Sequence, residues 1–356
     1  MASLTDRRDA DFWPSVLARV SGGASLSADE AAESMRAIME GDATPAQVGG
    51  LLMALRTKGE SVEEIAGFAD VMLEFASPVT PPDPLPGLVV VDTCGTGGDR
   101  SGTFNISTVG AIVAAGAGAT VAKHGNRAAT SDCGSADLLE ALGVRVDLDA
   151  AGVQRCLTEA GIGFMFAPAF HPATAYAVGI RRELRVPTAF NFLGPLTNPA
   201  RPGAQVVGVS DARMLPLVAE VLARRGVRAK VFRGEDGLDE LTTTGLSTVY
   251  EVVDGNLHER TLDPTDLGFA KASPEALLGG DVDRNVEIAR EVLAGAPGPT
   301  RDVVMLNAGA ALEVAGVAAS LADGIVVAAA SVDEGRASAV LDRWVACSAA
   351  ATSANG

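Results

Sequence analysis

A glycine-rich run between an apolar segment and a helical segment is the part of this sequence best suited to chemistry. Residues 92–99 read Asp-Thr-Cys-Gly-Thr-Gly-Gly-Asp and follow the apolar run Leu88–Val91. Glycines leave backbone N–H groups open to an anion, and the N-terminus of the helix expected from about Ser107 adds partial positive charge. Further hydrogen-bond donors follow in the same stretch, namely Thr103, Asn105, Ser107 and Thr108. The run predicts a phosphate-binding loop, with a plain tight turn as the alternative.

Two common phosphate-binding loops are excluded by the glycine spacing. The chain contains no G-x-x-x-x-G-K-[ST] motif, so it is not an ordinary P-loop nucleotidase. The run Gly95-Thr96-Gly97 lacks the third glycine of a dinucleotide-binding loop, because Arg100 occupies that position.

A second polar cluster, Lys123-His124-Gly125-Asn126-Arg127, follows the strand predicted at Thr120–Ala122. In open α/β sheets, ligands bind at the carboxyl ends of the strands. Two further hydroxyl groups, Ser131 and Ser135, come before the helix predicted at Ala136–Leu142. A lysine or arginine alone would indicate a charge that is solvated at the surface. A histidine alone would indicate a ring that is exposed or has its hydrogen bonds satisfied within the protein. The concentration of donors in one loop favours a second anion site.

Adjacent carboxylates occur at Asp239-Glu240, after the strand predicted at Lys230–Phe232 and before three threonines. Neighbouring negative charges repel each other, so such a pair is either exposed or placed beside a hard cation such as Mg²⁺. Exposure is the usual explanation, but the flanking Leu238 and Leu241 favour a defined position. The pair is therefore a candidate metal site.

A candidate carboxylate-binding residue is Arg181, in the run Gly179–Glu183. A guanidinium group pairs with a carboxylate through two parallel hydrogen bonds. Spacing alone leaves the alternative of a surface charge open. The run Asn191–Pro199 that follows contains Gly-Pro and Asn-Pro steps, which predict an ordered loop.

The surrounding elements predict an α/β protein with a small helical domain at its N-terminus. Helix starts are marked by capping boxes at Ser27, Thr44 and Ser61. The proline-rich stretch Ser77–Gly87 predicts a linker. After it, short apolar strands alternate with helices, which indicates a mainly parallel central sheet. Two later runs, Thr248–Val253 and His258–Leu262, predict a β-hairpin.

Composition limits the function classes. The net charge of −17 argues against nucleic acid as a partner. No apolar run reaches the roughly 18 residues of a membrane span, and the N-terminus does not resemble a signal peptide, so we expect a cytoplasmic protein without a membrane partner. The four cysteines show no C-x-x-C spacing, so neither a zinc site nor a disulfide framework is indicated.

Together these motifs resemble those of the anthranilate phosphoribosyltransferase family of tryptophan biosynthesis. Four signatures match in order over essentially the whole chain: residues 95–99 with 105–108, 123–127, 191–199 and 239–241. The resemblance implies transfer of the 5-phosphoribosyl group from phosphoribosyl pyrophosphate (PRPP) to the amine of anthranilate, giving N-(5-phosphoribosyl)anthranilate and pyrophosphate. It also implies two Mg²⁺ ions per active site and a homodimer formed through the helical domain.

Residue roles are implied by the same resemblance. The PRPP-binding residues would be Gly95, Gly98, Asp99, Thr103, Asn105, Ile106, Ser107, Thr108, Lys123, His124, Gly125, Asn126, Arg127, Ser131 and Ser135. The anthranilate-binding residues would be Gly95, His124, Asn126 and Arg181. The metal-binding residues would be Ser107, Asp239 and Glu240. No general base is assigned, because an aromatic amine needs little activation and positioning with leaving-group stabilisation carries the reaction.

The family's fold is that of the nucleoside phosphorylases and phosphoribosyltransferases of this type. It implies a helical domain of residues 1–80, completed by helices around 172–185, and a PRPP-binding α/β domain of residues 88–356. A pyrimidine nucleoside phosphorylase is the nearest rival, and the runs 123–127 and 239–240 favour the transferase. A non-catalytic nucleic-acid-binding relative is the other alternative, which the charge of −17 disfavours.

Overall fold

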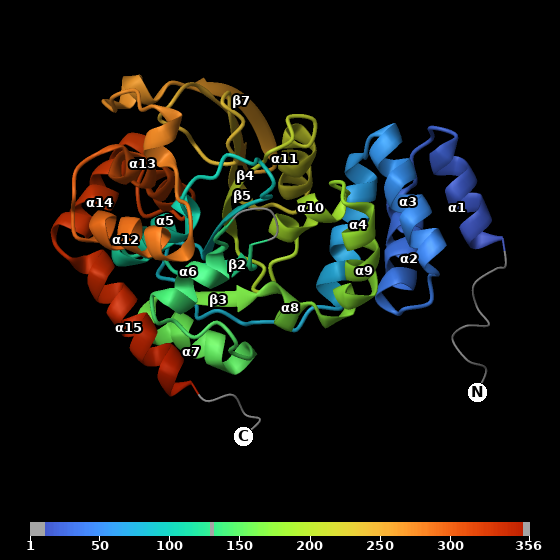
Figure 1. Cartoon of the computed structure of the whole chain (residues 1–356), viewed down its shortest axis with the longest axis horizontal. Helices are drawn as coiled ribbons and strands as arrows, with labels where there is room; N and C mark the ends of the chain where they lie inside the picture. Colours follow the sequence, from blue (N-terminus) through green and yellow to red (C-terminus); the bar gives the residue numbers. More distant parts are fainter. Residues whose placement is uncertain (1–10, 129–131, 352–356) are drawn as a thin grey trace. The chain divides into compact units, whose positions relative to one another are not determined.

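The computed structural model describes residues 11–128 and 132–351 (Figure 1). The chain divides into two compact units that interrupt each other in sequence. The first, here called the helical unit, comprises the chain up to Ser77 together with His171–Thr197. The second, here called the α/β unit, comprises Pro78–Phe170 and the chain from Asn198 onward.

The helical unit contains short helices with clear sequence signals at their starts. Its elements are α1 (Phe12–Ser21), α2 (Ala28–Met39), α3 (Pro45–Lys58), α4 (Val62–Glu74), η2 (Pro172–Thr174), α9 (Ala175–Leu184), α10 (Phe190–Leu193) and η3 (Gly194–Leu196). All three predicted capping boxes are confirmed, because the hydroxyls of Ser27, Thr44 and Ser61 each accept a backbone hydrogen bond three residues later.

The late segment of the helical unit packs on its early helices. Helix α9 contacts α2 and α3. Gly41, at φ +78°, leaves no room for a Cβ, which would lie 2.6 Å from the Tyr176 ring. Residues distant in sequence therefore complete one packed bundle.

A seven-stranded sheet forms the centre of the α/β unit, in the order β3-β2-β1-β4-β5-β6-β7. Its strands are β1 (Val91–Gly95), β2 (Val121–Gly125), β3 (Ile162–Phe166), β4 (Ala204–Gly208), β5 (Arg228–Gly234), β6 (Ser247–Val253) and β7 (Asn256–Leu262). Strands β1 to β5 are parallel, and β6 pairs antiparallel with both β5 and β7. The predicted fold class, a helical domain with a mainly parallel α/β domain, is confirmed.

The hairpin of β6 and β7 is confirmed as well. Its turn places Asp254 at φ +50° and Gly255 at φ +74°, the left-handed conformation that a two-residue hairpin turn requires.

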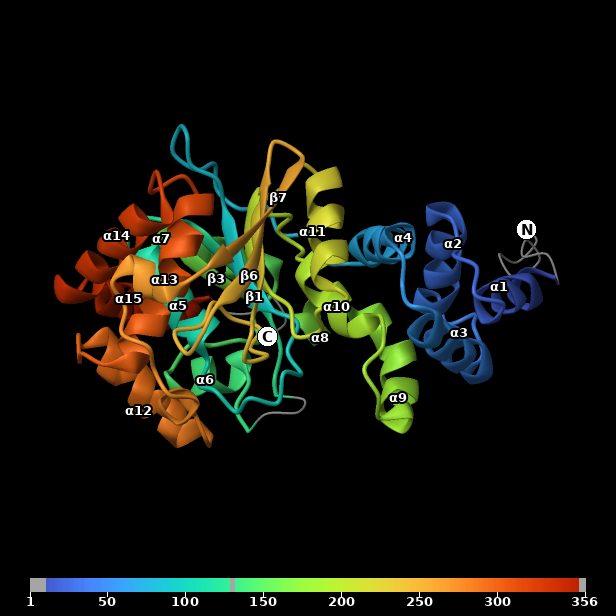
Figure 2. The same ribbon diagram turned by 90° about the horizontal axis from the view of Figure 1, so that it is seen from above.

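Helices lie on both faces of this sheet. The helices of the α/β unit are α5 (Ile106–Gly116), α6 (Ser135–Ala141), α7 (Ala150–Ala160), α8 (Ala167–Phe170), α11 (Leu215–Arg224), η4 (Pro264–Leu267), η5 (Pro274–Leu277), α12 (Val282–Leu293), α13 (Pro299–Val314), α14 (Leu321–Asp333) and α15 (Arg336–Ala350). Helices α5, α13, α14 and α15 gather on one side of the sheet, and α11 lies on the other (Figures 1 and 2). Helix α5 is buried over most of its length because α13, α14 and α15 pack around it. In residues 11–128 and 132–351, no helix has the length and apolar character needed to cross a bilayer.

Candidate active site

Polar and glycine-rich loops meet at the carboxyl ends of the parallel strands. Strand β1 ends at Gly95 and β4 ends at Gly208, and these two glycines are register partners. Strands β2 and β5 end nearby in the same sheet, at Gly125 and Gly234. The order of the strands therefore brings together loops that are far apart in sequence, at the edge where open α/β sheets bind ligands.

The loop after β1 has the backbone conformation that its glycines predict. Gly97 and Gly98 adopt φ values of +65° and +80°, which side chains larger than hydrogen disfavour. Both glycines are exposed, and the N–H of Gly97 donates to the Asp239 carboxylate. The Asp99 carboxylate accepts a hydrogen bond of 2.7 Å from the Ser101 hydroxyl, which lies 3.2 Å from the Thr103 hydroxyl. The loop thus combines exposed glycines with a hydrogen-bonded set of polar side chains.

Asp239 lies directly over the glycine pair that ends β1 and β4. A Cβ on Gly95 would be 2.4 Å from the Asp239 carboxylate, and a Cβ on Gly208 would be 1.6 Å from the Asp239 carbonyl oxygen. The same carboxylate accepts a hydrogen bond of 2.6 Å from the Gly97 N–H. Only glycine at both strand ends allows the acidic loop to approach this closely.

The acidic pair is crowded by negative charge. Burial raises the pKa of Asp239 to about 7, and repulsion from Asp99 adds to the effect. Burial and repulsion from Asp239 raise the pKa of Glu240 to about 8, although Lys123 opposes that shift. Glu240 also accepts a hydrogen bond of 3.1 Å from the Ser107 N–H at the start of α5.

These residues fit a magnesium ion that is shared with a phosphate ligand. Carboxylate oxygens are hard ligands, and a cation would offset the burial and the repulsion that raise the pKa values of Asp239 and Glu240. Among the residues described, no group of three or more His, Cys, Asp or Glu side chains forms a self-sufficient metal site. Mg²⁺ typically uses one or two carboxylates and completes its shell with water and substrate phosphates.

The start of α5 presents some of the predicted side chains and buries others. Ser107 is half-buried, beside Glu240 and 3.4 Å from the Lys123 ammonium group. The side chains of Ile106 and Thr108 are buried, with exposures of 0% and 1%. Contact between Ile106 and a phosphate would therefore have to go through its backbone.

Asn105 is held by residues from two other segments. Its side-chain amide donates to the Cys133 carbonyl and to the Asn285 side chain, each at 3.1 Å. Its backbone N–H donates to the same Asn285 oxygen at 3.0 Å. Asn285, on α12, carried no recognisable signal in the sequence, because its partner lies 180 residues away.

Lys123 lies beneath the loops. It is only 2% exposed, and its ammonium group donates to the Thr93 carbonyl and reaches the Ser107 hydroxyl at 3.4 Å. Burial lowers the pKa of Lys123, and the nearby carboxylates of Asp92 and Glu240 oppose that shift. The sequence predicted Lys123 in the loop after a strand at Thr120–Ala122, but strand β2 continues to Gly125, so Lys123 lies within the strand and its side chain is buried.

The rest of the loop after β2 is tied to α6. The Ser135 hydroxyl donates to the Asn126 carbonyl at 3.0 Å, and a Cβ on Gly125 would be 2.4 Å from that hydroxyl. His124 is 7% exposed, and its backbone N–H donates to Asp92 at 3.2 Å. The side chain of Asn126 is exposed. The predicted PRPP-binding residue Ser131 lies outside the described residues.

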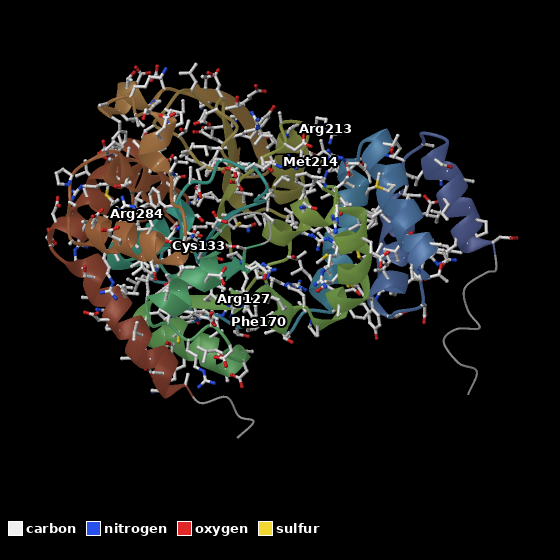
Figure 3. The ribbon with its side chains drawn as sticks, viewed as in Figure 1. Arg127, Cys133, Phe170, Arg213, Met214 and Arg284 are labelled. Carbon is white, nitrogen blue, oxygen red and sulfur yellow. The ribbon has the colours of Figure 1, made fainter. Side chains whose placement is uncertain are left out.

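Arg127 makes ion pairs within its own unit. Its guanidinium group donates to Asp137 at 2.9 Å and to both oxygens of Glu140 at 2.6 and 2.8 Å, and it lies 5.5 Å from the centre of the Phe166 ring. Arg127 and Cys133, both labelled in Figure 3, flank the start of α6. In this arrangement the guanidinium group of Arg127 is paired with the carboxylates of α6.

A buried pair, Asp92 and Asn198, links β1 and β2 near the starts of the two strands. The Asn198 amide donates to the Asp92 carboxylate and to the Ala122 carbonyl, each at 2.8 Å. Asp92 is fully buried, and burial raises its pKa although Lys123 and Asn198 favour the charged form. In the sequence, the Asn198-Pro199 step predicted an ordered loop at Asn198 but did not indicate its contact with Asp92.

Arg181 belongs to the helical unit, on α9. Its guanidinium carbon lies 5.2 Å from the centre of the Phe190 ring, and burial lowers its pKa. None of the described residues forms a hydrogen bond or ion pair with this guanidinium group, so its donors are available to a carboxylate.

Comparison with known protein families identifies the general class of this protein. The family model for the helical bundle domain of a glycosyl transferase family matches residues 14–76, and that for the α/β domain of the same family matches residues 88–338. The chain is thus a glycosyltransferase built from these two domain types.

Three relatives define the family more narrowly. The anthranilate phosphoribosyltransferase of a Nocardioides species is 54% identical over 342 residues, which cover 95% of this chain and 99% of the relative. The crystal structure of the Thermus thermophilus enzyme of that name is 44% identical, with a TM-score of 0.87, covering 94% of this chain and 99% of the other. The Saccharomyces cerevisiae enzyme in complex with PRPP and Mg is 26% identical, with a TM-score of 0.86, covering 96% and 99%. This chain belongs to the anthranilate phosphoribosyltransferase family.

Proposed function

We propose that this chain transfers the 5-phosphoribosyl group of PRPP to the amine of anthranilate, at the carboxyl ends of β1, β2 and β4. The observation that carries the proposal is the Asp239-Glu240 pair, with Asp239 packed over Gly95 and Gly208 and hydrogen-bonded to the Gly97 N–H, beside the exposed Gly98. A loop that binds phosphate and an acidic pair suited to Mg²⁺ are the two features that a pyrophosphate leaving group needs.

The donor would be held by the loops after β1 and β2. Gly98, Asp99, Thr103 and the start of α5 would bind its pyrophosphate, with backbone N–H groups as the main donors. Asn126 and Ser135 would contact it from the second loop, together with Ser131. Asp239, Glu240 and Ser107 would hold two Mg²⁺ ions, which when bound supply positive charge against the departing pyrophosphate.

The acceptor would be positioned through its carboxylate and its ring. Arg181 is the candidate partner of that carboxylate, because its guanidinium group is half-buried against Phe190 with its donors unused by described residues. Gly95, His124 and Asn126 are the candidate contacts of the acceptor in the α/β unit.

The reaction exchanges one bond at the anomeric carbon. The bond from ribose C1 to the pyrophosphate oxygen breaks, the leaving group keeps the electron pair, and the anthranilate nitrogen forms the new bond to C1. The proton that the nitrogen loses passes to water or to the released product. The protein's part is to bring both substrates together and to stabilise the leaving group.

The wider setting is part of the same proposal. The chain would act as a homodimer through its helical domain, in the cytoplasm, with no nucleic-acid or membrane partner. Its domains would be residues 1–80, completed by helices around 172–185, and residues 88–356. Size-exclusion chromatography with light scattering tests the dimer, since a monomeric mass at micromolar concentration contradicts it.

The first experiment follows anthranilate fluorescence over time with PRPP, Mg²⁺ and the protein. A decrease that requires all three supports the proposed activity. A constant signal from folded protein would contradict it, and phosphate-dependent release of base from thymidine would then favour a nucleoside phosphorylase.

A further inference from the structure

We infer that Asn307 on α13 is a positioning residue that sets the direction of the Glu240 carboxylate. The inference rests on the proposed function, because it gives Glu240 its purpose as a cation ligand. It adds a residue of the C-terminal helices to the machinery of the reaction.

Asn307 hydrogen-bonds to both polar backbone groups of Leu241, the residue after Glu240. Its carbonyl oxygen accepts from the Leu241 N–H at 3.0 Å, and its amide donates to the Leu241 carbonyl at 2.8 Å. The same amide donates to the Val303 carbonyl at 2.9 Å, one helical turn earlier. All hydrogen-bonding groups of the side chain except one lone pair are thus used.

This contact fixes Glu240 at its backbone. The Leu241 N–H belongs to the peptide that joins Glu240 to Leu241, so holding it restricts the ψ angle of Glu240. At the other end, the Glu240 carboxylate accepts from the Ser107 N–H at 3.1 Å. The acidic side chain is therefore held between α13 and α5.

The acidic loop needs such an external support because it has little regular structure of its own. Residues 235–246 lie between β5 and β6 without a helix or strand. Asn307 is 5% exposed and lines a small recess together with Ser107, Thr93 and Glu240. Asn307 is therefore almost fully shielded from solvent and lies beside the residues of the acidic site.

The test measures Mn²⁺ binding by electron paramagnetic resonance, with and without PRPP, in the Asn307→Leu variant. Leucine keeps the branching at Cγ, although it is larger than asparagine, and removes all three hydrogen bonds. Loss of a supporting contact of this kind typically weakens metal affinity by about 10- to 100-fold, and we expect about tenfold here. The half-saturating Mg²⁺ concentration for turnover should rise by about the same factor, with the anthranilate KM changed by less than about twofold.

The matched control is Ser331→Ala on α14, which also removes a buried hydrogen bond, of 3.0 Å to the Val113 carbonyl, away from the acidic loop. Unchanged Mn²⁺ affinity in Asn307→Leu, or an equal loss in Ser331→Ala, overturns the inference. If Asn307→Leu does not fold, Asn307→Ser is compared in the same way. Absence of turnover in the unmodified protein would contradict the proposed function, whereas the Mn²⁺ comparison would still decide the role of Asn307.

Discussion

Charge and burial are balanced against each other at single residues of the site. Lys123 and Asp92 are both buried, and each favours the charged form of the other. For Asp239 and Glu240, burial and mutual repulsion favour the neutral form, and the negative charge of Asp99 adds to this effect. Groups with shifted pKa values concentrate at functional sites, where a bound ligand or cation can relieve the repulsion between like charges.

The raised pKa values of Asp239 and Glu240 predict a pH-dependent stability. In the folded chain these carboxyls keep their protons up to about pH 7 and pH 8, whereas their ordinary values are 3.8 and 4.5. The folded state then binds more protons than the unfolded state between these limits, so the pair lowers stability as pH rises through this range.

The neutral double variant Asp239→Asn with Glu240→Gln should lack this penalty. Its melting temperature, relative to the unmodified protein without ligands, should increase between pH 5 and pH 8.5, while its Mg²⁺-dependent turnover falls. Thermal unfolding over that range measures the first effect. A difference that stays constant with pH would show that the carboxyls titrate normally.

A second prediction at this scale concerns Arg181. The Arg181→Ala variant should raise the anthranilate KM by about tenfold or more, because a charge-assisted hydrogen bond contributes about 1.5–3 kcal/mol. The PRPP KM should change much less. Steady-state kinetics decide the matter, with the exposed neighbour Arg182→Ala as control, and an unchanged anthranilate KM in Arg181→Ala would remove Arg181 from the site.

At the scale of elements, loops without regular structure are held by side chains from neighbouring elements. Asn285 of α12 holds the entry to α5, Asn307 of α13 holds the acidic loop, and Asn198 joins β1 to β2. An asparagine side chain both donates and accepts, so it can replace a backbone partner. The strand ends contribute by leaving space, through Gly95 and Gly208.

The Gly208→Ala variant tests this packing. A Cβ there would lie 1.6 Å from the Asp239 carbonyl oxygen, so the acidic loop must move away from β4. We expect the free energy of unfolding to fall by about 1–3 kcal/mol, the usual cost of overpacking, together with a loss of Mg²⁺-dependent activity.

Gly245→Ala is the matched control for Gly208→Ala, because its Cβ would have no atom within 4 Å in the same loop. Urea denaturation compares the two variants. Equal stabilities would mean that the loop accommodates the methyl group and that the glycine pair is not required.

At the scale of the whole molecule, the helical unit is assembled from two separate stretches of chain. Helix α9 returns to the early helices, with Tyr176 over Gly41 and Ile180 near Gly49. The chain up to Ser77 therefore lacks part of its own bundle.

This discontinuity predicts the behaviour of fragments. A fragment of residues 11–77 should be less stable than one in which a flexible linker joins it to residues 171–197. The expected difference is about 1–3 kcal/mol, the contribution of burying one large apolar side chain. Urea unfolding followed by circular dichroism measures it, and identical curves would show that α9 adds nothing to the bundle.

The sequence predicted the local features of this protein well. Capping boxes mark the helix starts because their hydrogen bonds join residues three positions apart. The glycine run after β1 and the acidic pair after β5 were recognisable because residue type and spacing reflect local chemistry. The alternation of strands and helices was sufficient for the fold class.

The tertiary structure alone decided which residues support that chemistry. Asn198 and Asp92 are 106 residues apart, and Asn307 and Leu241 are 66 apart, so no local pattern relates them. The burial of Lys123, Ile106 and Thr108 is likewise a property of the packed sheet and helices. Strand order sets which loops become neighbours, and it is determined by packing of the whole core, whereas sequence patterns report interactions within a few residues.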